Sequence, residues 1–282
     1  MYISLRTAFF AAALGLLGAS ASAPARATYI LQDTYYGGVD TWAYPSDVIG
    51  DPNTFNITSA AIGRTNAGNT LQVTINTNYA GKPESAAADG TGYGALFITP
   101  GSNGWTPQGA GPGYYNDTYQ PGDWMYAATI PLDPQSSAGA GGLYVTSGGT
   151  IVMSHVGNNY QTYPLDQSSP YYFRADQAVQ FAPGGGQATE AGTSESWMIG
   201  TDTITFTIND GGLLGDDFAL SWAMTCANDI IQGQVDLPAQ SHVDVPEPPT
   251  WSIVLAGLLF AGLTGARQPR RARSRRQRRV YC

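Results

Sequence analysis

Alternation of apolar and polar residues with a period of two dominates the central part of the chain. Residues 71–76 and 203–208 each place three apolar side chains on one face, and residues 217–226 repeat the pattern around Trp222. This period is typical of strands in which only one face is buried. Further β-branched and aromatic runs predict strands at 93–99, 124–130, 142–146, 150–156, 171–181 and 229–235.

Turn-forming sequences separate these strands at 67–69, 147–149 and 209–212. Ser-Gly-Gly at 147–149 is the clearest sign of a hairpin between neighbouring strands. About ten short strands and no convincing helix predict an all-β, antiparallel two-sheet sandwich of jelly-roll or lectin-like type. We expect one domain at 28–235. A barrel is the alternative, but unequal loops, among them 100–124, favour a sandwich.

The composition excludes several other classes of protein. The 282 residues include 35 glycines and 18 prolines, and only 12% of them are charged. So few charges argue against a coiled coil, a helical bundle and a charge-driven disordered chain. No internal repeat of fixed period is present, which argues against propellers and solenoids.

The charges are sorted along the chain. All 21 acidic residues lie between Asp33 and Glu247, where only Arg64, Lys82 and Arg174 are basic, so this part carries a net −18. Such a domain repels nucleic acid and anionic lipid and attracts cations, above all divalent ones. We therefore expect no nucleic-acid partner.

Residues 1–27 have the layout of a secretory signal peptide. Arg6 precedes an apolar run at 8–17, and small residues follow it. The run is too short for a membrane-spanning helix. Two cleavage sites compete, but Pro24 follows the first, so we expect cleavage after Ala27 and a mature chain that starts at Thr28. The sequence thus predicts export.

The C-terminal region has three parts. A proline-rich spacer at 236–250 precedes an uncharged apolar helix at 251–266 and an arginine-rich tail at 267–282. The helix would extend roughly 24 Å, at the short end for a membrane span. Arginines hold the tail on the cytoplasmic side. We expect the domain to lie outside the membrane, anchored by this helix.

The order Val245-Pro246-Glu247-Pro248, apolar helix and arginine cluster resembles the PEP-CTERM sorting signal. This resemblance implies processing near the motif by exosortase, a membrane-embedded cysteine transpeptidase of Gram-negative bacteria that make exopolysaccharide or biofilm. An ordinary membrane anchor behind a proline-rich linker is the alternative. Segments 93–98, 104–105, 122–127 and 221–229 also resemble ectodomains of PEP-CTERM proteins, which supports an intact domain but implies no activity.

The chain has two cysteines, Cys226 in a strand-like run and Cys282 at the end of the tail. Once the tail is removed, Cys226 would be the only cysteine in an oxidising compartment. No histidine lies near it in the sequence, so we interpret it as a small buried hydrophobe rather than a nucleophile or a disulfide partner.

Two acidic clusters are candidate calcium ligands, because calcium binds oxygens supplied by flexible, glycine-containing loops. The first comprises Asp33, Asp40, Asp47 and Asp51. The second, which we favour, comprises Asn209, Asp210, Asp216 and Asp217. It lacks the spacing of an EF-hand, and a hairpin loop in which Asn and Asp supply turn-forming hydrogen bonds is the alternative. Asp123 and Asp229 are weaker candidates.

Aromatic residues concentrate in the loop between the strands predicted at 93–99 and 124–130. Sugar rings stack on such side chains, so the candidate glycan-binding residues are Trp105, Tyr114, Tyr115, Tyr119 and Trp124. Packing in a β-sandwich core is the alternative for each of them. Glu190 and Glu195 could in principle supply the acid and base of a glycoside hydrolase, although exposure in a loop is the simpler interpretation. The sequence holds no triad or metalloprotease motif.

These features together predict an exported surface or matrix protein, processed by exosortase, with a structural or adhesive role in an exopolysaccharide layer or biofilm. We expect no catalysis, and calcium is the one candidate cofactor. A carbohydrate-binding module and a glycan-modifying hydrolase are the two alternatives.

Overall fold

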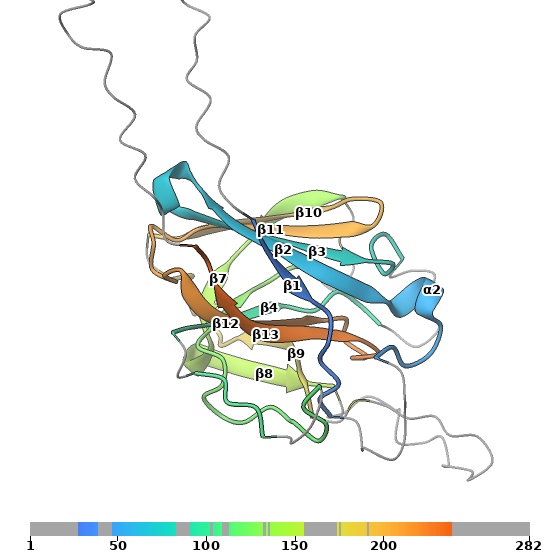
Figure 1. The fold of residues 1–282 in the computed structure, drawn as a ribbon. Coiled ribbons are helices and arrows are strands. Elements are labelled where there is room, and N and C mark those ends of the chain that lie inside the picture. The colour runs from blue at the N-terminus through green and yellow to red at the C-terminus, as the bar shows by residue number, and fades with distance from the viewer. Residues whose placement is uncertain are drawn as a thin grey trace, which may run out of the picture. The chain divides into compact units, whose positions relative to one another are not determined.

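The structure is a computed structural model that describes residues 28–38, 47–82, 91–101, 104–108, 113–131, 134, 136–154, 174, 176–190 and 192–238. Antiparallel strands make up most of these residues (Figure 1). The helices among them are one short α-helix, α2 (Pro52–Phe55), and the 3₁₀ turns η1 (Asn66–Gly68) and η3 (Thr146–Gly148). The chain divides into a unit at 1–239 and a second at 240–282, and every described residue belongs to the first.

The described strands form two main sheets and a hairpin. The first sheet has the order β1 (Tyr29–Gln32), β2 (Ile57–Thr65), β3 (Thr70–Thr77), β11 (Thr203–Asn209), β10 (Ser194–Ile199), β6 (Ala138–Gly141). The second has the order β13 (Ile230–Asp236), β12 (Asp217–Ala223), β4 (Leu96–Pro100), β5 (Tyr126–Ala128), β7 (Leu143–Val145). Strands β8 (Gly149–Met153) and β9 (Ala178–Pro183) pair with each other. The all-β sandwich predicted from the sequence is therefore confirmed at this level.

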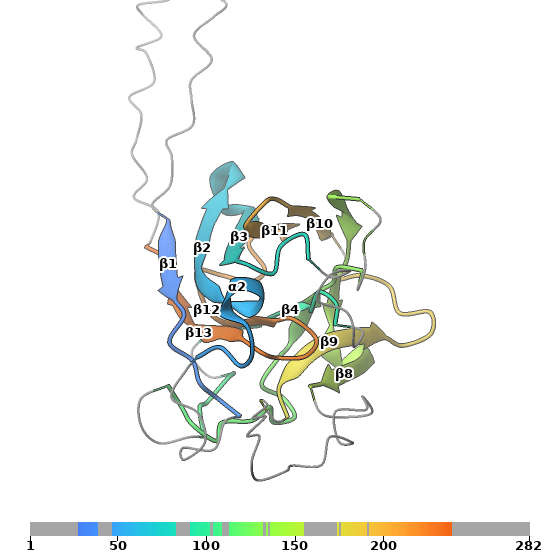
Figure 2. The ribbon, with the colours of Figure 1, turned by 90° about the vertical axis from the view of Figure 1, so that its right-hand side faces the viewer.

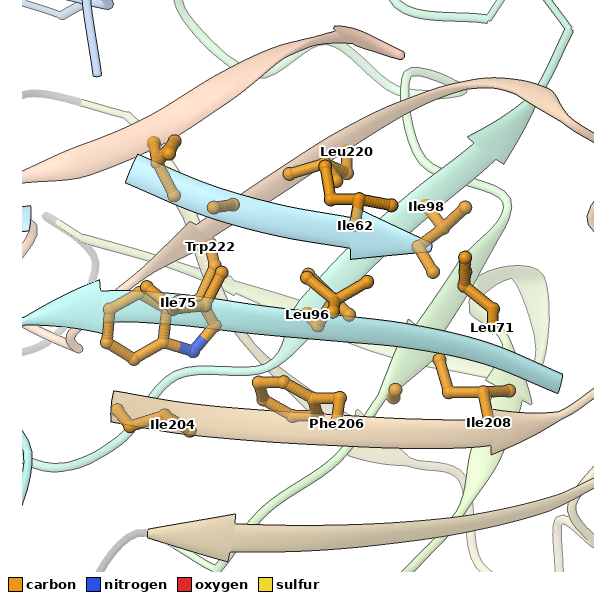
Figure 3. Close-up of a cluster of buried hydrophobic side chains, with 14 of the residues drawn as sticks. Ile62, Leu71, Ile75, Leu96, Ile98, Ile204, Phe206, Ile208, Leu220 and Trp222 are labelled. Carbon is orange, nitrogen blue, oxygen red and sulfur yellow. The ribbon is translucent and has the colours of Figure 1, made fainter. Parts of the chain in front are cut away.

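The main core lies between the two sheets (Figure 3). Leu71, Val73 and Ile75 of β3 are fully buried there, and so are the alternate apolar residues of β11, in the register that the period of two predicts. From the opposite sheet, Leu96 and Trp222 complete the packing. Sealing large aliphatic and aromatic side chains from water on both inner faces is the main favourable term in such a sandwich.

A second core lies on the outer face of the second sheet. Strand β12 is buried on both faces, because Ala219 and Ala223 point away from the main core and are still covered. The cover is supplied by the β8–β9 hairpin, which lies on the side of the second sheet away from the first (Figure 2), and by Tyr35, Trp105 and Trp124. The expectation that these strands bury one face only is wrong for the second sheet.

The predicted hairpin at 147–149 is also wrong. Strand β7 pairs with β5 of the second sheet, whereas β8 pairs with β9. The turn η3 between them carries the chain from the sheet into the outer layer, and the amide of Gly184 donates to the carbonyl of Gly148 there. Ser-Gly-Gly therefore marks a layer change rather than a tight hairpin. The turn at 67–69, in contrast, joins the paired strands β2 and β3 as expected.

Candidate functional site

The two tryptophans predicted to stack on glycan are buried. Trp105 is 7% exposed and Trp124 is 3% exposed. Their rings stack with centroids 6.5 Å apart and planes 16° from parallel, and Trp124 also packs against Phe97 of the second sheet. Both indoles belong to the second core, so their faces cannot receive a sugar ring. For these two residues the packing interpretation is correct.

Asp117 organises residues 104–108 and 113–124, which we call the aromatic loop and which cover this core. The carboxylate is buried and accepts hydrogen bonds from the Tyr35 hydroxyl at 2.8 Å, the Trp105 indole nitrogen at 3.2 Å and the Gln108 amide at 2.8 Å. The side-chain amide of Gln177 donates to the Asp117 carbonyl. Burial, followed by the charge of Asp117, raises the pKa of Tyr35, which therefore remains a donor. Several donors converging on one carboxylate fix the loop on the sheet.

Three tyrosines lie at the surface of this layer. Tyr114 is 41% exposed and sets its ring edge-on to buried Trp105, with centroids 5.7 Å apart and planes at 84°. Tyr115 and Tyr36 are half-buried and pack against each other with centroids 5.6 Å apart. We call Tyr36, Tyr114 and Tyr115 the surface tyrosines. Tyr119 is half-buried and packs on the second core.

The favoured calcium cluster contains an arginine. Arg64 is 3% exposed and donates from Nη1 and Nη2 to the two carboxylate oxygens of Asp210, at 3.0 and 3.1 Å. Its Nε lies 3.0 Å from Asp216. Asp210 also accepts from the backbone amides of Gly212 and Leu214. The guanidinium thus neutralises the acids that would have bound a cation.

The other two members of that cluster lie outside the ion pair. Asn209 is exposed at the end of β11, and Asp217 accepts from the side-chain amide of Gln234 at 2.9 Å. Across the described ranges, no group of three or more histidine, cysteine or acidic side chains is arranged to hold a metal ion. The geometry favours the turn-forming interpretation of this loop. The expected hairpin is wrong, because the loop joins β11 of the first sheet to β12 of the second.

Two members of the first acidic cluster, Asp33 and Asp47, lie near a different arginine. Arg174 is fully buried and donates to the carbonyl oxygens of Gly37, at 3.2 Å, and Asp47. Its Nη2 lies 3.8 Å from Asp229, which also accepts from the backbone amides of Ile57 and Ile230. Asp51 instead caps the N-terminus of α2, and Asp40 lies outside the described residues.

The acids beside Arg174 are shifted toward their neutral forms. Burial raises the pKa of Asp229 to about 7, although Arg174 opposes the shift. Burial, followed by the negative charge of Asp229, raises the pKa of Asp33 well above its usual value. Raised acids can signal catalysis, but the Asp229 side chain is fully buried and out of reach of any substrate. The cluster joins β13 to the segments around Gly37 and Asp47.

The predicted hydrolase pair does not form a site. Glu195 is 5% exposed and points into the sandwich from β10, opposite Gly141, so the expectation of an exposed loop is wrong for it. Within the described part of the chain, neither of its carboxyl oxygens has a hydrogen-bond partner. Burial raises its pKa to about 8. Glu190 lies half-buried before the strand. A carboxyl sealed between sheets cannot protonate a glycosidic oxygen.

Cys226 is partly buried against the main core. Burial raises its pKa to about 11, so the sulfur is held as the thiol rather than the reactive thiolate. This agrees with the interpretation of Cys226 as a small apolar side chain.

The chain matches no protein-family model, and searches of curated proteins and of solved structures give no significant match. None of the helices among the described residues is long and apolar enough to cross a membrane. The predicted signal peptide, the motif Val245-Pro246-Glu247-Pro248, the apolar helix and the tail all lie outside the described residues.

Proposed function

We propose that this chain is an exported surface or matrix protein that exosortase processes at its C-terminal signal. The observation that carries the proposal is the order of the last 38 residues: the motif Val245-Pro246-Glu247-Pro248, an uncharged apolar segment and an arginine cluster. Before processing, the apolar helix anchors the chain in the membrane. Afterwards the sandwich, of the jelly-roll or lectin-like class, resides at the cell surface or in an exopolysaccharide matrix.

Within that layer the sandwich has a structural or adhesive role. The buried acids of the described residues support this proposal because they serve the fold: Asp210 holds Arg64, Asp229 lies beside Arg174, and Asp117 anchors the aromatic loop. Strand β1 starts at Tyr29, one residue after the expected mature N-terminus, so cleavage there leaves the first sheet intact.

Intact mass of the protein recovered from the matrix and from the cell envelope tests this proposal. We expect a mass that corresponds to a chain from Thr28 to about the Pro-Glu-Pro motif. Glu247→Ala, which alters the motif, should leave the C-terminal part attached, whereas Glu190→Ala serves as a matched control and should be processed normally. A wild-type mass that retains Cys282 in both fractions would refute processing and leave a membrane-anchored protein.

A carbohydrate-binding module is the second candidate. One observation favours it: the exposed Tyr114 ring packs edge-on against buried Trp105, and the Trp105 indole donates a hydrogen bond to Asp117. Aromatic rings held at a protein surface are suited to the apolar faces of sugar rings.

A further inference from the structure

We propose that the surface tyrosines, Tyr36, Tyr114 and Tyr115, bind an uncharged polysaccharide chain. The inference rests on the proposed matrix location and adds to it the ligand class and the residues that contact the ligand. Three features carry it: the way Tyr114 is held, the pairing of the neighbouring rings and the charge that surrounds them.

Tyr114 adopts a backbone conformation that a large side chain rarely takes. Its φ is +56°, in the left-handed region, where a bulky residue is strained. The conformation is kept by the amide of Asp117, which donates to the Tyr114 carbonyl at 3.0 Å, and by the edge contact with Trp105. Tyr114 nevertheless exposes 41% of its surface, so its ring is held in place and remains accessible to a ligand.

The second ring pair is positioned just as tightly. The amide of Tyr36 donates to the Gly113 carbonyl at 2.7 Å. A Cβ on Gly113 would lie 2.2 Å from the Tyr36 ring, so only glycine allows this approach. Tyr36 then packs on Tyr115, next in sequence to Tyr114. Rings fixed before binding lose little conformational entropy when a ligand arrives, which favours affinity for a weakly binding sugar chain.

The surrounding charge selects the class of polysaccharide. Burial, followed by the negative charge of Asp47, raises the pKa of Tyr36, although Arg174 opposes the shift. Arg64 and Arg174 are both buried beside aspartates. The part of the chain from Asp33 to Glu247 has a net −18. An anionic polymer would therefore be repelled, whereas neutral sugar rings can stack and pair with the phenolic hydroxyls and exposed Asn116.

Affinity electrophoresis of the exported protein tests the inference. Native gels contain no polymer, an uncharged polymer (hydroxyethylcellulose, galactomannan or dextran) or the polyuronate alginate. We expect at least one uncharged polymer, and not alginate, to retard the wild type. Tyr114→Asn removes the ring but tolerates the left-handed backbone, and Tyr115→Ala removes the second ring. Each should weaken binding about threefold to tenfold. Tyr114→Phe should bind nearly as well as the wild type.

Met198→Ala is the matched control, because Met198 is 54% exposed on β10 of the other main sheet; it should be retarded like the wild type. Melting temperatures establish that each variant is folded. Retardation that survives both Tyr114→Asn and Tyr115→Ala overturns the inference, and so does preferential retardation by alginate. No retardation by any uncharged polymer also overturns it, even where the mass measurement supports export and processing. The two proposals therefore fail separately.

Discussion

Glu195→Gln should make the sandwich less sensitive to alkaline pH. The Glu195 carboxyl points inward from β10, and its Oε2 lies 1.7 Å from the position that a Cβ on Gly141 would take. Only glycine on β6 therefore leaves space for it. The same inward face of β10 carries Trp197, whose indole nitrogen is also buried without a partner among the described residues. Ionisation of Glu195 in this place would set an unpaired charge between two sheets.

The magnitude follows from the difference between the two titrations. An unfolded glutamate has a pKa of about 4.3, whereas burial raises the pKa of Glu195 to about 8. An acid whose pKa is higher in the folded protein stabilises the fold fully at pH values below its unfolded pKa. For Glu195 this contribution is lost as pH rises from about 4.3 to about 8. At about 1.36 kcal/mol per pH unit, the loss is about 2 kcal/mol by pH 6 and about 5 kcal/mol by pH 9, as upper values. The step between pH 6 and pH 9 is therefore about 3 kcal/mol.

Urea unfolding at pH 6 and at pH 9 measures this step. We expect wild-type protein to lose about 3 kcal/mol more than Glu195→Gln between the two pH values. Asp33 and Asp229 titrate in both proteins, so their contributions cancel in the comparison. Glu190→Gln is the matched control and should behave like the wild type. An equal loss in wild type and Glu195→Gln would show that the carboxyl is hydrated or paired, and the reasoning would then be wrong.

Three further predictions concern the other buried carboxylates and their partners. Arg64→Leu should lower the free energy of unfolding, measured in urea, by about 3–5 kcal/mol, because Asp210 is left buried and unpaired. The double variant Arg64→Leu, Asp210→Leu should recover part of this loss. A loss below about 3 kcal/mol for the single variant would contradict the pairing. If the guanidinium does take the place of a cation, calcium and chelators should leave the wild-type melting temperature unchanged. Asp117→Asn should lower the free energy of unfolding by about 2–4 kcal/mol, because charge-assisted hydrogen bonds are lost. Tryptophan fluorescence should shift to longer wavelength as Trp105 becomes more exposed to water. Unchanged fluorescence would argue against Asp117 as the anchor of the loop.

The strands of the main core could be predicted because their signal is local. In β3 and β11 each apolar residue is followed by a polar one, and a strand with that pattern has one arrangement that buries its apolar face. Strand β6, with the sequence Ala-Gly-Ala-Gly, has no such pattern, and it is placed by its pairing with β10. Tertiary pairing rather than propensity decides such a strand.

The second core could not be read from alternation. Its floor includes four small residues, Ala95, Ala127, Ala219 and Ala223, which a solvent-facing strand can also carry. Its cover comes from segments far apart in the sequence, such as those that contain Tyr35 and Trp105. The small side chains were the one indication of an outer core in the sequence. Alanine on the outward face of several neighbouring strands leaves space for large aromatic rings to approach the sheet. The predicted glycan site lost its two tryptophans for this reason.

The ion pair between Asp210 and Arg64, in contrast, could have been predicted from the position of Arg64 in the sequence. The nearby acidic residues instead suggested a metal site. Arg64 follows Ala60 and Ile62 on the buried face of β2, so period-two alternation alone places an arginine inside the domain. A buried guanidinium requires an acidic partner. The partner lies 146 residues away, and pairwise spacing could not identify it. A glycine-rich loop that holds several aspartates, as at 209–217, was nevertheless the best candidate, because such a loop can wrap the guanidinium with carboxylate and carbonyl oxygens together. The same chemistry that suggested calcium therefore also fits an arginine, and the inward position of Arg64 distinguishes the two.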